Sequence, residues 1–457
     1  MGQVVTNLEG NVSFDQESWK LLGEALARLD AGFADLPAVS SNPDLPRLQA
    51  VLRQVAERLQ DNYPYHHPLY AGQMLKPPHP VARLAYALAM WLNPNNHALD
   101  GGRASSAMEK EVVAELAGMF GWETHLGHLT SGGTLANLEA LWVAGRQRPG
   151  QTVLASTQAH YTHSRISAVL QLPFAAVPTD SWGRMDVPAL HARLAQGDVG
   201  TVVVTLGTTA TGAVDPLPAI LDLRARHGFR VHVDAAYGGY FTLADNLSAS
   251  ARTAFDHLGA VDSIAIDPHK HGLQPYGCGC VLFRDPAVGA FYRHDSPYTY
   301  FTSAELHLGE ISLECSRAGA AAVGLWATHQ LLPPRRGGDF AADLEKCRQA
   351  ALLLAQRLDE DSRFRLPFMP ELDIVVWAVN AGSASEASAR AQAIFTAAAA
   401  RNLHLALAQL PAAFFAPTWP DLIADQDHIT CLRSCLMKPE HLDWLDAIWQ
   451  ILDEVSG

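Results

Sequence analysis

The chain has 457 residues, 48% of them hydrophobic, so it is long enough to bury a large core and to divide into two or three domains. Its 33 basic and 47 acidic residues give a formal net charge of −14, which argues against non-specific nucleic-acid binding. The six cysteines match neither a disulfide framework nor a zinc site, and no stretch approaches the length of an apolar membrane span. We therefore expect a cytoplasmic protein with no metal site.

Residues 1–65 are predicted to form a helical segment. Apolar residues recur at three and four positions between Glu17 and Leu59, which indicates two amphipathic helices. Such helices pack either on another subunit or on the core of their own chain, and the pattern leaves both open. A proline-stiffened loop with aromatic and imidazole groups follows and suits the mouth of a pocket. Its residues are Tyr63, Tyr65, His66, His67, Tyr70 and His79.

Residues 66–332 are predicted to form a large α/β domain with a mostly parallel central sheet, because continuous apolar runs alternate with helical stretches. The expected strands are 152–155, 201–205, 230–234, 263–266 and 279–283. The run Pro333-Pro334-Arg335-Arg336-Gly337-Gly338 marks a break. Residues 333–457 then read as a smaller α+β domain, with helices near 340–358 and 439–455 and a strand at 374–379.

Small residues and hydroxyls stand where a helix begins, in Ser131-Gly132-Gly133-Thr134. Backbone N–H groups and the positive end of the helix dipole there form an anion site suited to a phosphate, although a Thr N-cap after a glycine turn would explain this motif by itself without a ligand. His160 follows the first expected strand, and an imidazole in that place could stack on a flat ring. The hydroxyl-rich loop that contains Thr208 follows another strand and could hold a ligand or be an ordinary turn.

Lys270 and Asp234 carry the strongest chemical signal. Asp234 ends an apolar strand and is followed by the small residues Ala235 and Ala236, so its carboxylate could hold a protonated pyridine nitrogen or cap the following turn. Lys270 follows the next expected strand in a glycine-rich context, where a lysine can form an imine. A lysine paired with an upstream strand-end aspartate is what pyridoxal phosphate chemistry requires.

The ordered set of these motifs resembles the group II pyridoxal-phosphate-dependent amino-acid decarboxylases, the family of glutamate, tyrosine, aromatic-amino-acid and histidine decarboxylases. The resemblance extends from about His67 to Arg433. It implies the aspartate-aminotransferase fold (fold type I), pyridoxal 5'-phosphate as cofactor, and a homodimer whose active site lies at the subunit interface. The segment Tyr298–Ser303 resembles the part that the partner subunit contributes.

The resemblance also implies the roles of individual residues. Lys270 would form the imine with the cofactor, Asp234 would pair with the pyridinium nitrogen, and His160 would stack on the ring. Candidate donors of the proton to the substrate α-carbon are His160, Tyr298 and Tyr300. The other residues placed around the cofactor by the resemblance are Ser131, Gly132, Gly133, Thr134, Thr208, Ala236, His269 and Ser303.

Decarboxylation of an L-amino acid is therefore the predicted reaction, with an aromatic, tyrosine-like substrate slightly favoured because of the aromatic loop. Glutamate or aspartate is the alternative, because the same histidines could hold a side-chain carboxylate. Arg317 and Arg433 keep a carbon–carbon lyase and an aminotransferase open. A catalytically silent binding protein of the same fold is a third interpretation. His271 departs from the family, where an aromatic residue often follows the lysine.

Overall fold

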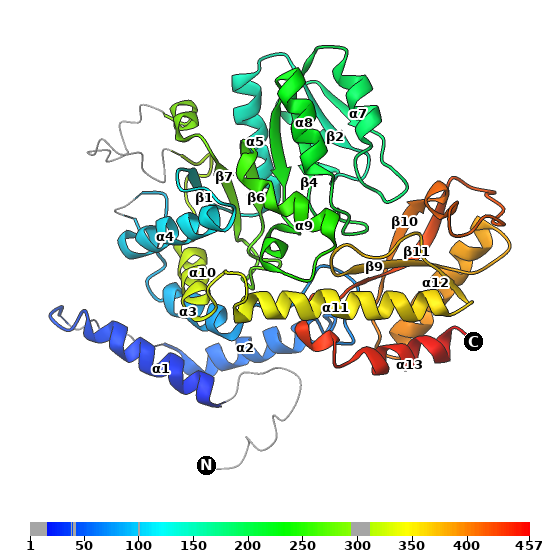
Figure 1. Ribbon diagram of the computed structural model, residues 1–457. Helices are drawn as coiled ribbons and strands as arrows, with labels where there is room; N and C mark the ends of the chain where they lie inside the picture. Colours follow the sequence, from blue (N-terminus) through cyan, green and yellow to red (C-terminus); the bar gives the residue numbers. More distant parts are fainter. Residues whose placement is uncertain (1–15, 38, 40–42, 99–100, 294–310) are drawn as a thin grey trace.

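Two β-sheets organise the chain. The computed structural model describes residues 16–37, 39, 43–98, 101–293 and 311–457, and Figure 1 shows the larger sheet beside the smaller one. The larger sheet has seven strands in the order β1-β7-β6-β5-β4-β2-β3. These strands are β1 (Leu126–Thr130), β2 (Thr152–Ser156), β3 (Phe174–Val177), β4 (Val199–Thr205), β5 (Arg230–Asp234), β6 (Ser263–Ile266) and β7 (Gly279–Phe283).

The mostly parallel sheet predicted from the sequence is confirmed. Strands β3, β2, β4, β5 and β6 pair in parallel, whereas β7 pairs antiparallel with both β6 and β1. The five strands expected from apolar runs are present, and β1 and β3 are additional. Strand β3 lies at the sheet edge and is only partly buried, so it lacks the continuous apolar run of a central strand.

Helices cover both faces of the larger sheet. Helix α5 (Gly133–Gln147) packs its small residues Ala136 and Ala140 on one face, against Val281 of β7. The opposite face packs on helices α4, α8 and α9 in the largest apolar cluster. The helices before and within this domain are α3 (Pro80–Met90), α4 (Arg103–Met119), α6 (Thr162–Val169), α7 (Val187–Leu194), α8 (Leu217–His227), α9 (Ala249–Asp256) and α10 (Gly319–Leu331).

The smaller sheet is antiparallel and has the order β10-β11-β9-β8. Its strands are β8 (Phe364–Arg365), β9 (Ile374–Val379), β10 (Ala406–Pro411) and β11 (His428–Cys435), and its helices are α11 (Asp339–Glu360), α12 (Ala384–Ala400) and α13 (Leu445–Val455). Leu354 of α11, Trp377 of β9 and Ile448 of α13 meet in its core. Helix α11 runs from the larger domain along the base of the smaller one (Figure 1).

Short 3₁₀ helices complete the described secondary structure, at η1 (Gly239–Leu243), η2 (Leu258–Ala260), η3 (Pro286–Phe291), η5 (Ala412–Phe415) and η6 (Pro439–His441). Cys278 and Cys280 are buried in the apolar core, where they serve as packing residues. Within the described parts of the chain, no helix is both long and apolar enough to cross a membrane.

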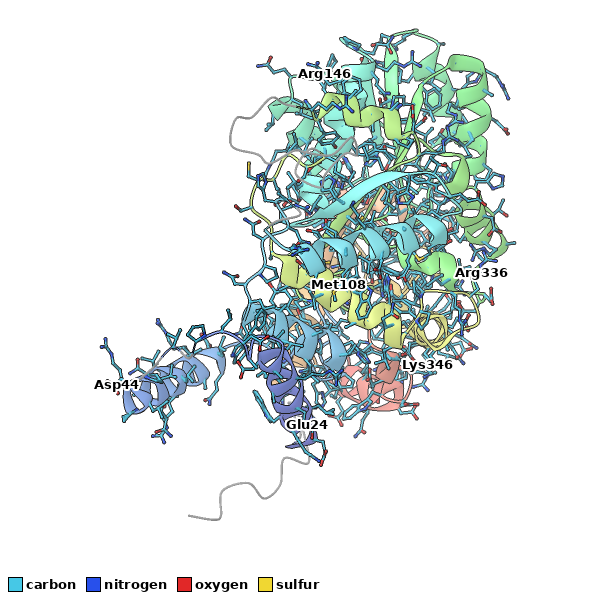
Figure 2. All side chains as sticks on the ribbon, turned by 90° about the vertical axis from the view of Figure 1, so that its left-hand side faces the viewer. Glu24, Asp44, Met108, Arg146, Arg336 and Lys346 are labelled. Carbon is cyan, nitrogen blue, oxygen red and sulfur yellow. The ribbon has the colours of Figure 1, made fainter. Side chains whose placement is uncertain are left out.

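The two N-terminal helices predicted from periodicity are confirmed as α1 (Gln16–Ala31) and α2 (Leu45–Leu59). They extend away from the body of the chain, as the positions of Glu24 and Asp44 show (Figure 2). Helix α2 buries none of its residues, and its apolar side chains are exposed. Within the single chain, α2 therefore does not pack on the core of its own chain, which was one of the two alternatives left open by its sequence.

Candidate active site

A cavity of about 420 Å³ opens where the carboxyl ends of β4, β5 and β6 meet the first turn of α5. Ligands of α/β folds bind at this end because loops and helix N-termini converge there. Nine of the ten predicted site residues that the structure describes line this cavity: Ser131, Gly132, Gly133, Thr134, His160, Asp234, Ala236, His269 and Lys270. The tenth, Thr208, does not. The structure thus brings together motifs that are spread over 140 residues of sequence.

Lys270 stands on the turn that follows β6. Its Nζ atom lies 2.9 Å from Oδ2 of Asp267, and its side chain is 21% exposed, so the amine is reachable from the cavity. Asp267 begins the same turn, accepts a hydrogen bond from the Lys270 backbone N–H at 2.9 Å, and is itself buried. Sequence reasoning did not assign a role to Asp267. The one sequence feature that could have pointed to Asp267 is its position three residues before Lys270.

Asp234 ends β5 beneath the cavity and is almost fully buried. Its Oδ2 atom lies 2.8 Å from Nε2 of His163, and its Oδ1 atom accepts a hydrogen bond from the Ala236 backbone N–H at 3.1 Å. The carboxylate therefore caps the following turn and also remains available to a ligand, because each oxygen has a further lone pair. Both interpretations of Asp234 from the sequence are compatible with this geometry.

His163 determines the charge of Asp234. Burial alone would raise the pKa of this carboxyl, but the hydrogen bond from His163 and the electrostatic interactions with His163 and Lys270 hold the pKa of Asp234 well below its usual range. Because a carboxylate only accepts hydrogen bonds, Nε2 of His163 carries the proton. An ionised aspartate at the base of the cavity attracts a protonated ring nitrogen.

The first turn of α5 forms the opposite end of the cavity. The N-cap is Gly132 and no side chain caps the helix, so the Thr N-cap considered from the sequence is not formed. A Cβ atom on Gly133 would lie 2.7 Å from Oδ2 of Asp267, which shows how closely the backbone approaches that carboxylate. Uncapped N–H groups in a cavity wall favour an anionic ligand such as a phosphate.

Two imidazoles flank this space. Burial lowers the pKa of His160, so its neutral form is favoured, and its Nδ1 atom lies 2.8 Å from the Thr162 hydroxyl. Burial likewise lowers the pKa of His269, whose Nδ1 atom has no hydrogen-bond partner among the described residues. Tyr276 stacks obliquely on His269 with ring centroids 4.8 Å apart. The buried Nδ1 atom of His269 has no partner in the described part of the chain and lies beside the uncapped end of α5, so it suits a hydrogen bond to a phosphate oxygen.

The prediction for Thr208 is corrected by the structure. Its side chain is fully buried, its hydroxyl lies 2.9 Å from that of Thr211, and it accepts the Ala213 backbone N–H. The neighbouring Thr209 lines the cavity instead. Gly207 has a φ of +96°, and this left-handed turn decides which of the two adjacent threonines faces the ligand space.

The aromatic and histidine side chains of the loop expected at the pocket mouth contact the smaller domain instead. The ring centroids of Tyr63 and His404 lie 5.0 Å apart, and those of His67 and Trp444 lie 4.7 Å apart. His404 and Trp444 both belong to the smaller domain. None of the six aromatic and histidine residues of that loop lines the described cavity. The aromatic preference inferred from them loses this support, because adjacency in sequence to a proline-rich loop did not fix where the loop docks.

The two arginines considered for a substrate carboxylate already have partners. Arg317 Nη1 lies 2.6 Å from Glu109 Oε1 and also donates to the Leu129 backbone carbonyl. Arg433 donates to the Thr209 carbonyl at 2.7 Å, which places it behind the cavity wall. Tyr298, Tyr300 and Ser303 lie outside the described residues.

The residues present fit pyridoxal phosphate. An uncapped helix N-terminus with an unpartnered imidazole nitrogen suits the phosphate, the ionised Asp234 suits the ring nitrogen, and the accessible amine of Lys270 suits the aldehyde. The cavity volume lies within the usual range for cofactor pockets of about 300–1,000 Å³. Fold and site together define the class of pyridoxal-phosphate-dependent enzymes built on fold type I.

The family follows from comparison with known proteins. Residues 65–380 match the family described as "Pyridoxal-dependent decarboxylase conserved domain". The chain therefore belongs to the pyridoxal-dependent decarboxylases, which confirms the predicted cofactor and the assignment of the enzyme as an amino-acid decarboxylase, a carboxy-lyase. The alternatives of a different carbon–carbon lyase, an aminotransferase and a catalytically silent protein have no such support.

Curated relatives agree with this assignment, and solved structures share the fold. A "Probable L-aspartate decarboxylase" of Halobacterium salinarum is 34% identical over 268 residues, which cover 58% of this chain and 71% of that protein. An L-tyrosine decarboxylase of Enterococcus faecium is 28% identical over 409 residues, with 66% and 67% covered. Mouse CSAD superposes with a TM-score of 0.76 at 20% identity, covering 96% of this chain and 99% of that one. Oryza sativa TDC, solved with PLP and tryptamine, superposes with a TM-score of 0.76 at 16% identity, covering 97% of this chain and 99% of that one. These likenesses confirm the fold.

Proposed function

We propose that this enzyme decarboxylates an L-amino acid at the described cavity, with Lys270 as the residue that binds the cofactor covalently and Asp234 as the partner of its ring nitrogen. One observation carries the assignment: the Lys270 amine and the ionised Asp234 carboxylate face the same cavity, whose far wall is the uncapped end of α5. Pyridoxal phosphate, when bound, withdraws electrons from the substrate α-carbon as carbon dioxide leaves.

The chain's own residues hold the reacting groups in place. His163 keeps Asp234 ionised, so a positive charge near that carboxylate is stabilised throughout the reaction. The imidazole of His160 has Nδ1 directed at Thr162, which leaves Nε2 as the nitrogen that can exchange a proton. We place His160 first among the candidate proton donors, ahead of Tyr298 and Tyr300.

The substrate side chain is the finer question. Support for a tyrosine-like amino acid comes from the tyrosine decarboxylase relatives and from Tyr276, which is 57% exposed and stacks on the cavity residue His269. Support for aspartate comes from the 34% identical relative and from the polar lining of the cavity. We rank the aromatic substrate first, because the exposed Tyr276 ring lies beside the cavity residue His269, although Tyr276 does not itself line the cavity, and can contact an aromatic side chain that extends past that residue.

Release of carbon dioxide tests the proposal directly. The purified enzyme with added pyridoxal phosphate is assayed with L-tyrosine, L-tryptophan, L-phenylalanine, L-histidine, L-glutamate and L-aspartate side by side. We expect tyrosine to give a kcat/KM at least about tenfold above that of the other five, since an unpaired or misfitting side chain costs 1–3 kcal/mol. A reversed order in favour of aspartate would select the second candidate. Cofactor binding without gas from any of these or the other proteinogenic amino acids would contradict the function.

We further propose that two copies form the active unit. Helix α2 exposes one continuous apolar face in the single chain, made of Leu45, Leu48, Val51, Leu52, Val55 and Leu59. A monomer gains nothing from a helix that buries no residue, whereas a second copy can cover this face. Self-association also fits the way α1 and α2 extend from the body (Figure 2).

Charge placed on that face tests the dimer. Leu48→Glu combined with Leu52→Glu should convert the dimer to a monomer, because two buried carboxylates cost several kcal/mol at an apolar interface. The control is Ala50→Glu, which adds a carboxylate on the opposite side of the same exposed helix. Light scattering after size-exclusion chromatography reports the mass. A wild-type monomer, or a double variant that remains dimeric, would rule out this interface.

A cytoplasmic location is the last part of the proposal. It rests on the six cysteines, all of which are free thiols, five of them buried. Free thiols are typical of a reducing compartment.

A further inference from the structure

A buried polar cluster lies directly behind Lys270. It consists of His271, Tyr237 and Asp373, whose side chains are almost entirely removed from solvent. The Tyr237 hydroxyl donates a hydrogen bond to Oδ1 of Asp373 at 2.7 Å. Nε2 of His271 lies 3.2 Å from Oδ2 of the same carboxylate. One carboxylate thus faces two side chains of the larger domain.

The three residues come from different parts of the fold. His271 is the residue next to Lys270, and Tyr237 is one of the residues that line the cavity. Asp373 immediately precedes β9, a central strand of the smaller sheet. The smaller domain therefore delivers a single carboxylate to the back of the site. That carboxylate contacts both the turn that bears the lysine and the aromatic wall of the cavity.

Charge and packing both hold this cluster in place. Burial alone would raise the pKa of Asp373, but His271, Tyr237 and the partly buried Lys76 outweigh it and lower that pKa below its usual range. Burial lowers the pKa of His271, while Asp373 opposes the shift. The imidazole is clamped edge-on between Tyr237 and Phe241, with ring centroids 4.8 and 4.9 Å away. A buried carboxylate without these donors would be strongly unfavourable.

The turn transmits any displacement of His271 to Lys270. Adjacent Cα atoms are fixed at about 3.8 Å, so the two residues move together. The turn is also rigid on its other side, because a Cβ on Gly272 would meet the Tyr240 hydroxyl and the Pro268 backbone. Gln274 further ties the turn by donating to the Gly272 carbonyl at 3.0 Å and to the Thr328 hydroxyl at 2.8 Å. Of these restraints, Asp373 is the one that comes from the smaller domain.

We propose that Asp373, acting through His271 and Tyr237, is a positioning residue that holds the Lys270 amine toward the cofactor space and couples the smaller domain to it. The inference rests on Lys270 being the cofactor-binding lysine. Asp373 touches neither substrate nor cofactor in this role. It fixes the orientation of the lysine turn and of the Tyr237 ring.

The test measures how fast the cofactor-free protein captures pyridoxal phosphate. Full-length protein stripped of cofactor is mixed with pyridoxal phosphate, reduced with borohydride at timed intervals, and the modified Lys270 peptide is quantified by mass spectrometry. His271→Phe keeps the ring packing but removes both nitrogens, and Asp373→Asn keeps the size and the acceptor for Tyr237. Each should slow capture about tenfold, since small misplacements of a reacting group cost up to 10²-fold.

A double variant and a rescue variant distinguish positioning from general destabilisation. The His271→Phe/Asp373→Asn double variant should be no slower than the slower single variant, because both changes remove the same link. His271→Gln retains an N–H donor for Asp373 and should recover most of the rate. Tyr237→Phe removes the other donor to Asp373 and should slow capture in the same direction, which keeps the test decisive if Asp373→Asn does not fold.

The matched control is another buried histidine paired with a carboxylate. Nδ1 of His329 lies 2.6 Å from Oε2 of Glu115, and His329 does not line the Lys270 cavity. His329→Phe should lower the thermal midpoint of the cofactor-free protein without changing the rate of capture. Folded His271→Phe and Asp373→Asn variants that capture the cofactor at the wild-type rate would overturn the positioning role, and so would additive losses in the double variant. Wild-type protein modified at a lysine other than Lys270 would instead refute the site assignment itself.

Discussion

Replacement of Lys270 by alanine should lower kcat/KM for decarboxylation by about 10³-fold or more. The Lys270 amine, which lies 2.9 Å from Asp267, is the nucleophile proposed to attach the cofactor in the cavity. Covalent attachment of the cofactor splits the reaction into easier steps. The purified variant should also lose the absorbance near ~420 nm that is typical of a protonated pyridoxal phosphate imine. Steady-state carbon dioxide release and a visible spectrum report the two effects.

Lys346 provides the matched control. This lysine sits on α11 with a half-exposed side chain and an ion pair to Asp343, and it is marked in Figure 2. Lys346→Ala should leave both the rate and the spectrum unchanged. Retention of the ~420 nm band by Lys270→Ala would show that a different lysine binds the cofactor.

Substitution of Asp234 by asparagine should reduce kcat by about 10²–10⁴-fold, the range seen when a group that stabilises developing charge is removed. Asparagine keeps the size of the side chain and an acceptor for the Ala236 N–H, but it loses the charge that His163 stabilises. Cofactor affinity should fall as well, which a fluorescence titration of cofactor-free protein measures. Asp343→Asn, on an exposed part of α11, is the control and should behave as wild type.

The pH dependence follows from the lowered pKa of Asp234. A carboxyl whose folded pKa lies below its unfolded value gives its stabilisation fully above the unfolded value and loses it only as the pH falls through the folded value. Asp234 is therefore ionised from about pH 5 to pH 9 and should add no inflection to the kcat/KM profile in that range. An inflection in that interval that disappears in Asp234→Asn would contradict the ionised state.

Much of the fold was accessible from local pattern. The five central strands are continuous apolar runs because both of their faces are covered, and α1 and α2 follow from the spacing of their leucines and valines. Strand β3 escaped prediction because an edge strand is only partly buried. Where α2 and the loop from Tyr63 to His79 would pack was also beyond local reasoning, because docking depends on surfaces that lie far away in the sequence.

The sequence by itself determined the chemistry of this protein, because the residue types and their order select a cofactor: a lysine and an aspartate at successive strand ends, and a glycine turn opening a helix. Only the tertiary structure decided the partners that tune these groups. His163 reaches Asp234 across 71 residues, and Asp373 reaches Tyr237 across 136. The backbone turn at Gly207 places Thr209, and not Thr208, in the cavity wall. Hydrogen bonds and charge interactions act over a few ångströms, so they depend on which elements pack together and not on spacing along the chain.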